Sequence, residues 1–137
     1  LQPMVALAEE HGVVLQMELF NSIVDHPDYM ADSSRWGIEL ARALNSPSFK
    51  LLYDIYHMQI MEGNLVANIK ENHQWYGHYH VAGVPGRNEP WESQEINYPA
   101  VMAAIESTGF NGYVALEYLF TTNKKESMAR SFTEFIR

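Results

Sequence analysis

Short apolar runs alternate along the chain with longer segments in which apolar residues recur at helical spacing. Four of the runs have the length and composition of buried strands, and most of them follow a turn signal that contains Gly, Pro or Asn. We expect strands at residues 13–19, 49–54, 76–82 and 113–118, and helices at residues 4–10, 32–44, 64–72, 99–107 and 124–136. One helix followed by four strand–helix units predicts an α/β fold, in which helices cover a parallel sheet.

Two of the predicted helices begin at residues that are typical helix caps. Asp32 and Ser33 begin the helix at 32–44, and Asn64 begins the helix at 64–72. Trp91 follows the third strand and would either pack or line a pocket. We interpret five other aromatic residues as packing between helices and sheet, namely Trp36, Trp75, Phe110, Phe132 and Phe135.

Each predicted strand finishes on a side chain that can bind a metal ion. These residues are Glu18, Asp54, His80 and Glu117. Parallel sheets with helical crossovers bind ligands at the C-terminal ends of their strands, in open sheets and closed barrels alike. One polar residue at a strand end is ordinary, because strands often finish in solvent. Four polar side chains at successive strand ends, all on the same face of the predicted sheet, instead favour one shared site.

Three carboxylates and one imidazole form a donor set that is rich in oxygen and contains no soft ligand. Such a set suits Mn²⁺ or Mg²⁺, and Zn²⁺ or Co²⁺ also fits. An ion held there would chelate adjacent carbonyl and hydroxyl oxygens of a sugar-like substrate and stabilise an enediolate. Glu18 and Glu117 lie on the first and fourth strands. We therefore expect one of them to take a substrate proton and the other to return it.

Two further histidines lie close to these strand ends. His57 follows Asp54 by three residues, in what we expect to be a loop. It would hydrogen-bond a developing oxyanion, or else bond a main-chain carbonyl as an ordinary loop histidine. His78 precedes His80 by two residues, so it points to the same side one layer deeper. We interpret His78 as a core residue or a support for the ligands.

The loop after the third predicted strand contains Pro85 and Gly86 directly before Arg87. A rigid proline and a permissive glycine can aim this arginine at a substrate carboxylate or phosphate, which its planar fork binds through two hydrogen bonds. The alternative is a surface arginine paired with Glu89 or Glu92. Two other loops, at residues 21–34 and 58–63, would either cover the site or serve as a cap and a packed loop.

Composition narrows the classes of function. Nine Lys and Arg residues against seventeen Asp and Glu residues give a formal net charge of −8, which disfavours binding to nucleic acid or to an anionic membrane. The 47% hydrophobic and 19% charged content is typical of a globular chain. With no cysteine, disulfides, thiolate zinc sites and a cysteine nucleophile are excluded.

No apolar run approaches the ~20 residues that span a bilayer. The start of the chain, residues 1–4, has no basic region followed by an apolar stretch of the kind found in signal peptides. We therefore expect a cytoplasmic protein. The chain does not begin with Met, which is compatible with a true N-terminus upstream.

Two long motifs resemble the hydroxypyruvate isomerase family. They are DIYHMQIMEGN at residues 54–64 and HVAGVPGRNEP at residues 80–90, with EINY following at 95–98. That family belongs to the xylose isomerase-like TIM barrels, together with the ketose 3-epimerases. The resemblance covers about residues 13–118 and implies the C-terminal half of a (β/α)8 barrel, from its fourth helix to its eighth. A full barrel takes ~250 residues.

The resemblance also implies roles for individual residues. Glu18, Asp54, His80 and Glu117 would bind the metal ion, with Glu18 and Glu117 as the acid/base pair. His57 and Arg87 would contact the substrate. The chain departs from the family patterns at two positions. His80, which the 3-epimerases also carry, stands where some hydroxypyruvate isomerases have Gln, and Val24 stands where the epimerases have a further Glu.

Together these observations predict a metal-dependent isomerase that converts hydroxypyruvate to tartronate semialdehyde. A ketose 3-epimerase or another sugar isomerase of the superfamily is the nearest alternative, and an endonuclease would need more metal-binding histidines and a basic groove. A non-catalytic half-barrel that binds metal is an alternative from another class. We expect residues 1–137 to form a single domain. Its partners would be a small substrate, and either the missing N-terminal half-barrel or a second copy of the chain that closes the barrel.

Overall fold

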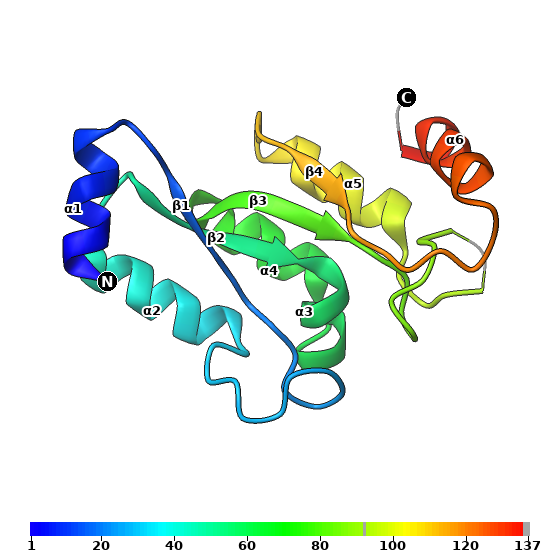
Figure 1. Cartoon of the computed structure of the whole chain (residues 1–137), viewed down its shortest axis with the longest axis horizontal. Helices are drawn as coiled ribbons and strands as arrows, with labels where there is room; N and C mark the ends of the chain where they lie inside the picture. Colours follow the sequence, from blue (N-terminus) through cyan, green and yellow to red (C-terminus); the bar gives the residue numbers. More distant parts are fainter. Residues whose placement is uncertain (92, 136–137) are drawn as a thin grey trace.

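Four parallel strands form one sheet in the computed structural model, which describes residues 1–91 and 93–135 (Figure 1). The strands lie in chain order, β1–β2–β3–β4, and each pairs in parallel with the next. The elements are α1 (Gln2–Glu10), β1 (Leu15–Glu18), α2 (Ser34–Leu44), β2 (Phe49–Asp54), α3 (Ile55–Met61), α4 (Leu65–Asn72), the 3-10 helix η1 (His73–Trp75), β3 (Tyr76–Val81), α5 (Tyr98–Ser107), β4 (Val114–Leu116) and α6 (Lys124–Phe135).

This architecture confirms the predicted α/β fold of one helix followed by four strand–helix units. The Ser33 hydroxyl accepts a hydrogen bond from the Trp36 main-chain N–H, so the predicted cap of α2 is confirmed. Asn64 also precedes its helix, but it adopts a left-handed conformation and makes no side-chain cap bond. Ile136, the predicted end of the last helix, lies outside the described residues.

The prediction of a loop after the second strand is wrong. Helix α3 begins there without any linker, because the Asp54 side chain accepts a hydrogen bond from the His57 main-chain N–H and caps the helix. The short η1 was not predicted either. One side chain thus ends a strand and starts a helix, and it holds residues 55–57 directly beside the strand ends.

The two faces of the sheet differ in burial. On one face Leu51, Tyr53 and Tyr79 are fully buried, and α2 packs against β2 while α3 packs against β3. On the opposite face Gln16 is exposed, and Leu52 is only partly buried. A closed (β/α)8 barrel fills this second face with layers of side chains. The chain is a partial barrel whose interior face is open.

A one-residue bulge in β3 decides which side chains reach that open face. Leu51 pairs with Tyr76, but Leu52 pairs with His78, so Gly77 is the extra residue. A Cβ atom at Gly77 would lie 2.8 Å from the Lys50 Cβ, which is fixed to the neighbouring strand, and this close approach explains why a glycine occupies the bulge. Beyond the bulge, β3 presents His78 on the same face as Leu52.

The aromatic residues only partly follow the prediction. Trp36, Trp75 and Phe110 are partly buried against the core, as expected. Phe132 is 61% exposed, so its predicted packing on the sheet is wrong; Figure 1 shows α6 beside the loops after β3 and β4 rather than over the sheet. The side chain of Phe135 lies outside the described residues. Trp91 lies under the Arg130 guanidinium and lines a surface pocket.

Among the described helices, none has both the length and the apolar character that a membrane span needs.

Candidate metal centre

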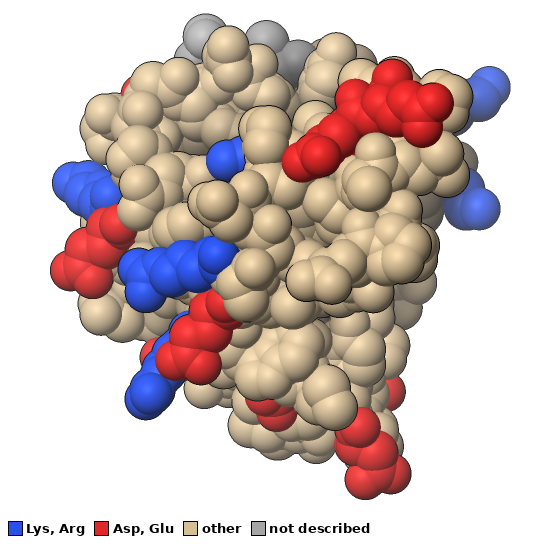
Figure 2. Space-filling model, turned by 90° about the vertical axis from the view of Figure 1, so that its left-hand side faces the viewer, with Lys and Arg blue, Asp and Glu red and all other residues tan. Residues whose placement is uncertain are grey.

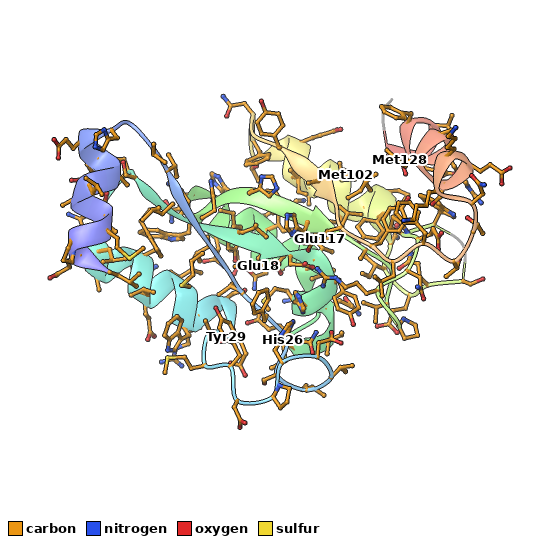
Figure 3. The ribbon with its side chains drawn as sticks, viewed as in Figure 1. Glu18, His26, Tyr29, Met102, Glu117 and Met128 are labelled. Carbon is orange, nitrogen blue, oxygen red and sulfur yellow. The ribbon has the colours of Figure 1, made fainter. Side chains whose placement is uncertain are left out.

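Glu18, Asp54, His80 and Glu117 come together at one end of the sheet. Each offers one potential ligand atom, and these atoms all lie within 4.8 Å of one another. Figure 3 labels Glu18, at the end of β1, and Glu117, directly after β4. These two outer strands bring the two glutamates together beside the ends of the inner strands, β2 and β3. The predicted convergence of the four strand ends is therefore what the fold produces.

Each of the four side chains is placed by the sheet itself. Glu18 is the last residue of β1, and Asp54 pairs with His80 across β2 and β3. Glu117 directly follows β4, and its main-chain N–H donates to the Val81 carbonyl at 3.0 Å. Because main-chain hydrogen bonds of neighbouring strands fix these positions, the donor set does not depend on a flexible loop.

Two buried atoms at this point lack hydrogen-bond partners among the described residues. They are Glu18 Oε1 and His80 Nδ1. The His80 nitrogen faces three carboxylates, at 2.9 Å from Glu117 Oε2, 3.5 Å from Glu18 Oε1 and 3.8 Å from Asp54 Oδ2, without an aligned hydrogen bond. Buried polar atoms are normally paired. Three oxygen donors and one nitrogen with unsatisfied buried atoms fit a divalent cation such as Mn²⁺ or Mg²⁺.

The carboxylates dominate the electrostatics of this group. Burial opposes a charge on His80, but the close carboxylates of Asp54, Glu18 and Glu117 outweigh it and raise the pKa of His80 to about 10. Burial likewise opposes ionisation of Asp54, yet His80 and Arg87 together lower the pKa of that carboxyl below its ordinary value. The group therefore attracts positive charge strongly, whether a proton or a metal ion.

Arg87 lies inside the site rather than on the surface. Its Nη2 donates to Asp54 Oδ2 at 2.7 Å and also to Glu117 Oε2, and its guanidinium stacks over the Tyr56 ring at 4.8 Å. The surface pairing that we considered for Arg87 is not seen with Glu89, and Glu92 lies outside the described residues. Gly86 and Arg87 both have positive φ, at 88° and 56°, so the predicted turn does direct this side chain.

His57 is buried in the first turn of α3 and faces the same site. Its Nδ1 accepts a hydrogen bond from the Asn21 main-chain N–H at 3.1 Å, so the alternative of a loop histidine bonded to a carbonyl is wrong. Burial lowers the pKa of His57 to about 4 despite the nearby Asp54 charge, which keeps the ring neutral at pH 7. His78 stays outside the four-residue group, with its ring centroid 5.0 Å from that of His80.

The loop after β1 closes one side of the site. Phe20 and His26 stack at 4.4 Å. Both line a pocket of about 480 Å³, together with Glu18, Asp25, His57, Arg87 and Glu117. Figure 3 shows His26 and Tyr29 in this loop, next to the end of the sheet that carries Glu18. Of the two loops considered as covers, the one at 21–34 borders the site, whereas residues 58–61 belong to α3.

Sequence reasoning missed the role of Glu89, a residue that is only 7% exposed and whose carboxylate joins the two loops that carry Arg87 and Glu117. It accepts hydrogen bonds from the Thr121 main-chain N–H at 2.9 Å and the Thr121 hydroxyl at 2.7 Å, and from the Ser127 hydroxyl. Burial opposes ionisation, but these hydrogen bonds lower the pKa of Glu89 to about 2. The residues that donate lie more than 30 positions away, so no local sequence signal indicated this role.

Replacing Glu89 by glutamine is expected to lower the free energy of unfolding by about 1–3 kcal/mol at pH 7, because hydrogen bonds to a charged acceptor are lost. The pKa of Glu89 is lower in the folded state than its ordinary value of 4.5, so its stabilisation is complete above that value and disappears as the pH falls toward 2. Urea unfolding at pH 7 and pH 3 measures the difference. Glu71→Gln, at an exposed position of α4, is the matched control. A deficit that stays constant between the two pH values would contradict the role of the charge.

Comparisons with known proteins agree with this geometry. A family model described as xylose isomerase-like TIM barrel matches residues 1–137. The hydroxypyruvate isomerase of Escherichia coli K12 is 35% identical over 109 residues, which cover 80% of this chain and 42% of that protein. The 2-oxo-tetronate isomerase of Pectobacterium atrosepticum is 34% identical over 108 residues, which cover 79% of this chain and 40% of that protein.

A solved structure titled AP endonuclease, family 2, from Brucella melitensis superposes with a TM-score of 0.90 at 28% sequence identity. The superposition covers 97% of this chain and 51% of the Brucella chain. The chain spans only about two fifths of the length of the two named isomerases. A parallel sheet of β–α units, the strand-end donor group and the match along all its residues lead to one conclusion: this chain belongs to the xylose isomerase-like TIM barrel family.

Proposed function

We propose that the protein carrying this chain is a metal-dependent isomerase of small hydroxy-keto acids, which converts hydroxypyruvate to tartronate semialdehyde. The observation that carries the proposal is the group of four strand-end donors, whose ligand atoms lie within 4.8 Å of one another. The names of the two bacterial relatives support the substrate class, since hydroxypyruvate and 2-oxo-tetronate are both keto acids.

Glu18, Asp54, His80 and Glu117 would hold the ion, Mn²⁺ or Mg²⁺ by the hardness of the donors. When bound, a divalent cation supplies a Lewis acid that polarises the substrate carbonyl and stabilises the charge on neighbouring oxygens. Asp54 is fully buried, so it serves only to hold the ion and to position its neighbours.

Glu18 and Glu117 are the acid/base pair of the proposal. Their side chains are 22% and 51% exposed and come from opposite edges of the sheet, so both can reach a substrate. One carboxylate removes a proton from the hydroxymethyl carbon of the substrate, and the other returns a proton to the former carbonyl carbon. The hydroxyl hydrogen of the former hydroxymethyl group moves to the oxygen of the former carbonyl group. One C–H and one O–H bond are thus broken and one of each is formed.

His57 and Arg87 are the proposed substrate contacts. Both line the same pocket as the two glutamates, and Arg87 offers the fork that binds a carboxylate through two hydrogen bonds. A keto acid brings such a carboxylate, whereas a neutral ketose does not. This difference favours the acid substrate over the sugar.

The direct test is proton exchange. The protein is incubated in D₂O with Mn²⁺ or Mg²⁺ and hydroxypyruvate, and product and deuterium incorporation are followed by mass spectrometry after removal of the metal. Formation of tartronate semialdehyde with metal-dependent deuterium uptake is the expected result. Metal binding without exchange or turnover would instead support a non-catalytic metal-binding unit.

We further propose that a second half-barrel completes the fold, with residues 1–137 as one domain. β1 and β4 are the edges of the sheet, and the face between them is open. On the flank, Leu1, which precedes α1, and Met4 and Leu7 within α1 are 54–59% exposed. Figure 2 views the molecule from the α1 side and shows uncharged surface between scattered charges of both signs. An N-terminal half-barrel of the same protein would cover these surfaces, and a second copy would do so in a homodimer.

The chain alone is therefore expected to associate, because edge strands and an open apolar face in water favour pairing. Gel filtration with light scattering, over a range of concentrations, measures the mass. Addition of an N-terminal half-barrel from a relative should convert the assembly to a one-to-one complex. A monodisperse 15.7 kDa monomer that unfolds cooperatively and takes up no partner would show that the half-barrel is self-sufficient.

His80→Ala is expected to weaken Mn²⁺ binding by at least about tenfold, since one of four ligands is lost. In the wild type, affinity should rise with pH between about 6 and 10, because the ion must displace the proton that the carboxylates hold on His80, whose pKa is raised to about 10. Calorimetry on metal-stripped protein measures both effects. His73→Ala, at an exposed position, is the control. Unchanged affinity in the His80 variant would exclude this site.

A further inference from the structure

Both ring nitrogens of His57 face hydrogen-bond donors. The Asn21 main-chain N–H lies 3.1 Å from Nδ1, and the Asn21 side-chain nitrogen lies 2.6 Å from the same atom. On the other side of the ring, Arg87 Nη1 lies 2.8 Å from Nε2, and the nearest carboxylate oxygen, Asp54 Oδ2, lies 3.8 Å from it, too far for a hydrogen bond. In a neutral imidazole one ring nitrogen carries a hydrogen and the other accepts a hydrogen bond. Only one of the two nitrogens of His57 can therefore accept from the donors that face it.

The surroundings of Asn21 decide which nitrogen accepts. Its Oδ1 accepts hydrogen bonds from the main-chain N–H groups of Val24 and Asp25, both at 2.9 Å. The amide orientation follows from these bonds, so Nδ2 is the group that faces His57 and also donates to Asp25 Oδ2 at 2.7 Å. Asn21 is fully buried, and its main-chain N–H cannot become an acceptor. Nδ1 of His57 is therefore the acceptor, and Nε2 carries the hydrogen.

We propose that Asn21 is a positioning residue that holds His57 as the Nε2–H tautomer, so that His57 and Arg87 together present two N–H groups to one acceptor oxygen of the substrate. In this tautomer the Nε2–H group of His57 and the Nη1–H group of Arg87 point at each other, with 2.8 Å between the two nitrogens, and neither finds an acceptor in the other. An oxygen that accepts from both removes this conflict, and a carboxylate or enediolate oxygen does so best, because charged acceptors form the stronger hydrogen bonds. The inference rests on the proposed function and specifies its substrate as one with an anionic oxygen at this point.

Asp25 links the two donors. Its Oδ2 accepts from Asn21 Nδ2 at 2.7 Å and from the Tyr56 hydroxyl at 2.8 Å, and the Tyr56 ring supports the Arg87 guanidinium. One carboxylate thus fixes both the residue that sets the tautomer of His57 and the ring under Arg87. The shared oxygen would lie in the same pocket as Glu18 and Glu117, beside the proposed acid/base pair.

Nitrogen NMR on the full chain with ¹⁵N-labelled histidine rings, in Mg²⁺, reads the tautomer directly; His57→Gln identifies the signals. The wild type is expected to show a protonated Nε2 and an unprotonated Nδ1. Asn21→Asp keeps the acceptor for the two loop N–H groups but faces Nδ1 with a carboxylate, so Nδ1 should gain a proton. Asn111→Asp, at an exposed position, is the control for added charge. A protonated Nδ1 in the wild type, or an unchanged pattern in Asn21→Asp, would overturn the assignment.

The shared oxygen is tested by titration with tartronate, a dicarboxylate probe, against glycerol as a neutral probe. Tartronate should shift the His57 Nε2 signal in the wild type, with an effect at least about tenfold weaker in Asn21→Asp because a hydrogen bond to a charged group is lost. Equal responses to tartronate and glycerol, or none to either, would overturn the pairing of donors. This readout needs no turnover.

Kinetics then separate a donor from a proton carrier. His57→Gln keeps an N–H near the position of Nε2, so kcat/KM for hydroxypyruvate should fall less than about tenfold, and His57→Leu should lose about 10–100-fold, mainly through KM. Equal, large losses in kcat for both variants would mean that His57 transfers a proton and that the inference is wrong. A wild type with the expected ring pattern and tartronate response but no isomerase activity would refute only the proposed function.

Discussion

Glu117→Gln is expected to abolish the exchange of substrate protons with solvent, with a loss of about 10²–10⁴-fold in kcat. Glutamine keeps the shape of the side chain but cannot accept a proton. Glu117 is 51% exposed at the open end of the sheet, so the chain has no packing reason to require a carboxylate there. Deuterium incorporation into hydroxypyruvate and product in D₂O measures the effect.

Saturating Mn²⁺ is needed in this experiment, because the same substitution weakens the donor group. Glu106→Gln, at an exposed position of α5, serves as the control and should leave exchange unchanged. Glu18→Gln should likewise lower the exchange and the turnover, because it removes the other member of the acid/base pair. Wild-type exchange in Glu117→Gln at saturating metal would remove Glu117 from the acid/base pair.

Asp54→Asn is expected to reduce Mn²⁺ affinity by more than about 100-fold, a larger effect than at the other three positions, because Asp54 is the fully buried member of the group. Asparagine keeps the oxygen that caps α3 through the His57 main-chain N–H, so the helix should remain. In this variant Arg87 keeps its hydrogen bond to Glu117 but loses the one at 2.7 Å to the charged Asp54 carboxylate. In the absence of metal this loss should lower the free energy of unfolding by about 1–3 kcal/mol.

Calorimetry with Mn²⁺ and urea unfolding of metal-stripped protein measure these two effects separately. Asp28→Asn, at an exposed position of the loop after β1, is the matched control. If Asp54→Asn bound Mn²⁺ as tightly as the wild type, the ion would have to bind elsewhere. If it were fully unfolded, Asp54→Glu would test the charge with the carboxylate retained.

The sequence was sufficient for the order of elements and for the candidate ligands. Apolar runs of strand length and helical periodicity are local properties, and the predicted strands at 49–54 and 76–82 differ from β2 and β3 by no more than one residue. The shorter β1 and β4 were predicted too long because both are edge strands, paired on only one side. The convergence of Glu18, Asp54, His80 and Glu117 follows from parallel topology, since parallel strands end at the same edge of the sheet.

Features that depend on contacts between distant residues could not be predicted in this way. A capping bond from Asp54 turned a predicted loop into α3 and buried His57. The donors to Glu89 and the acceptor for Asn21 lie more than 30 residues away in sequence, so neither residue carried a local signal. The helical periodicity of residues 124–136 correctly predicted α6. The predicted packing of Phe132 on the sheet was wrong, because the pattern of a helix does not say which surface the helix contacts.

The sequence by itself thus determined the parallel α/β topology and the four residues at the strand ends, because chain order and the bounds of the apolar runs are local properties of the chain. Only the tertiary structure decided how those residues combine. The bulge at Gly77 sets the register of β3, and without it the alternation from Tyr76 onward would turn His78 and His80 toward the helices. The turn before Arg87 allows its side chain to reach the site, but only the folded arrangement brings Asp54, Glu117 and His57 within its reach.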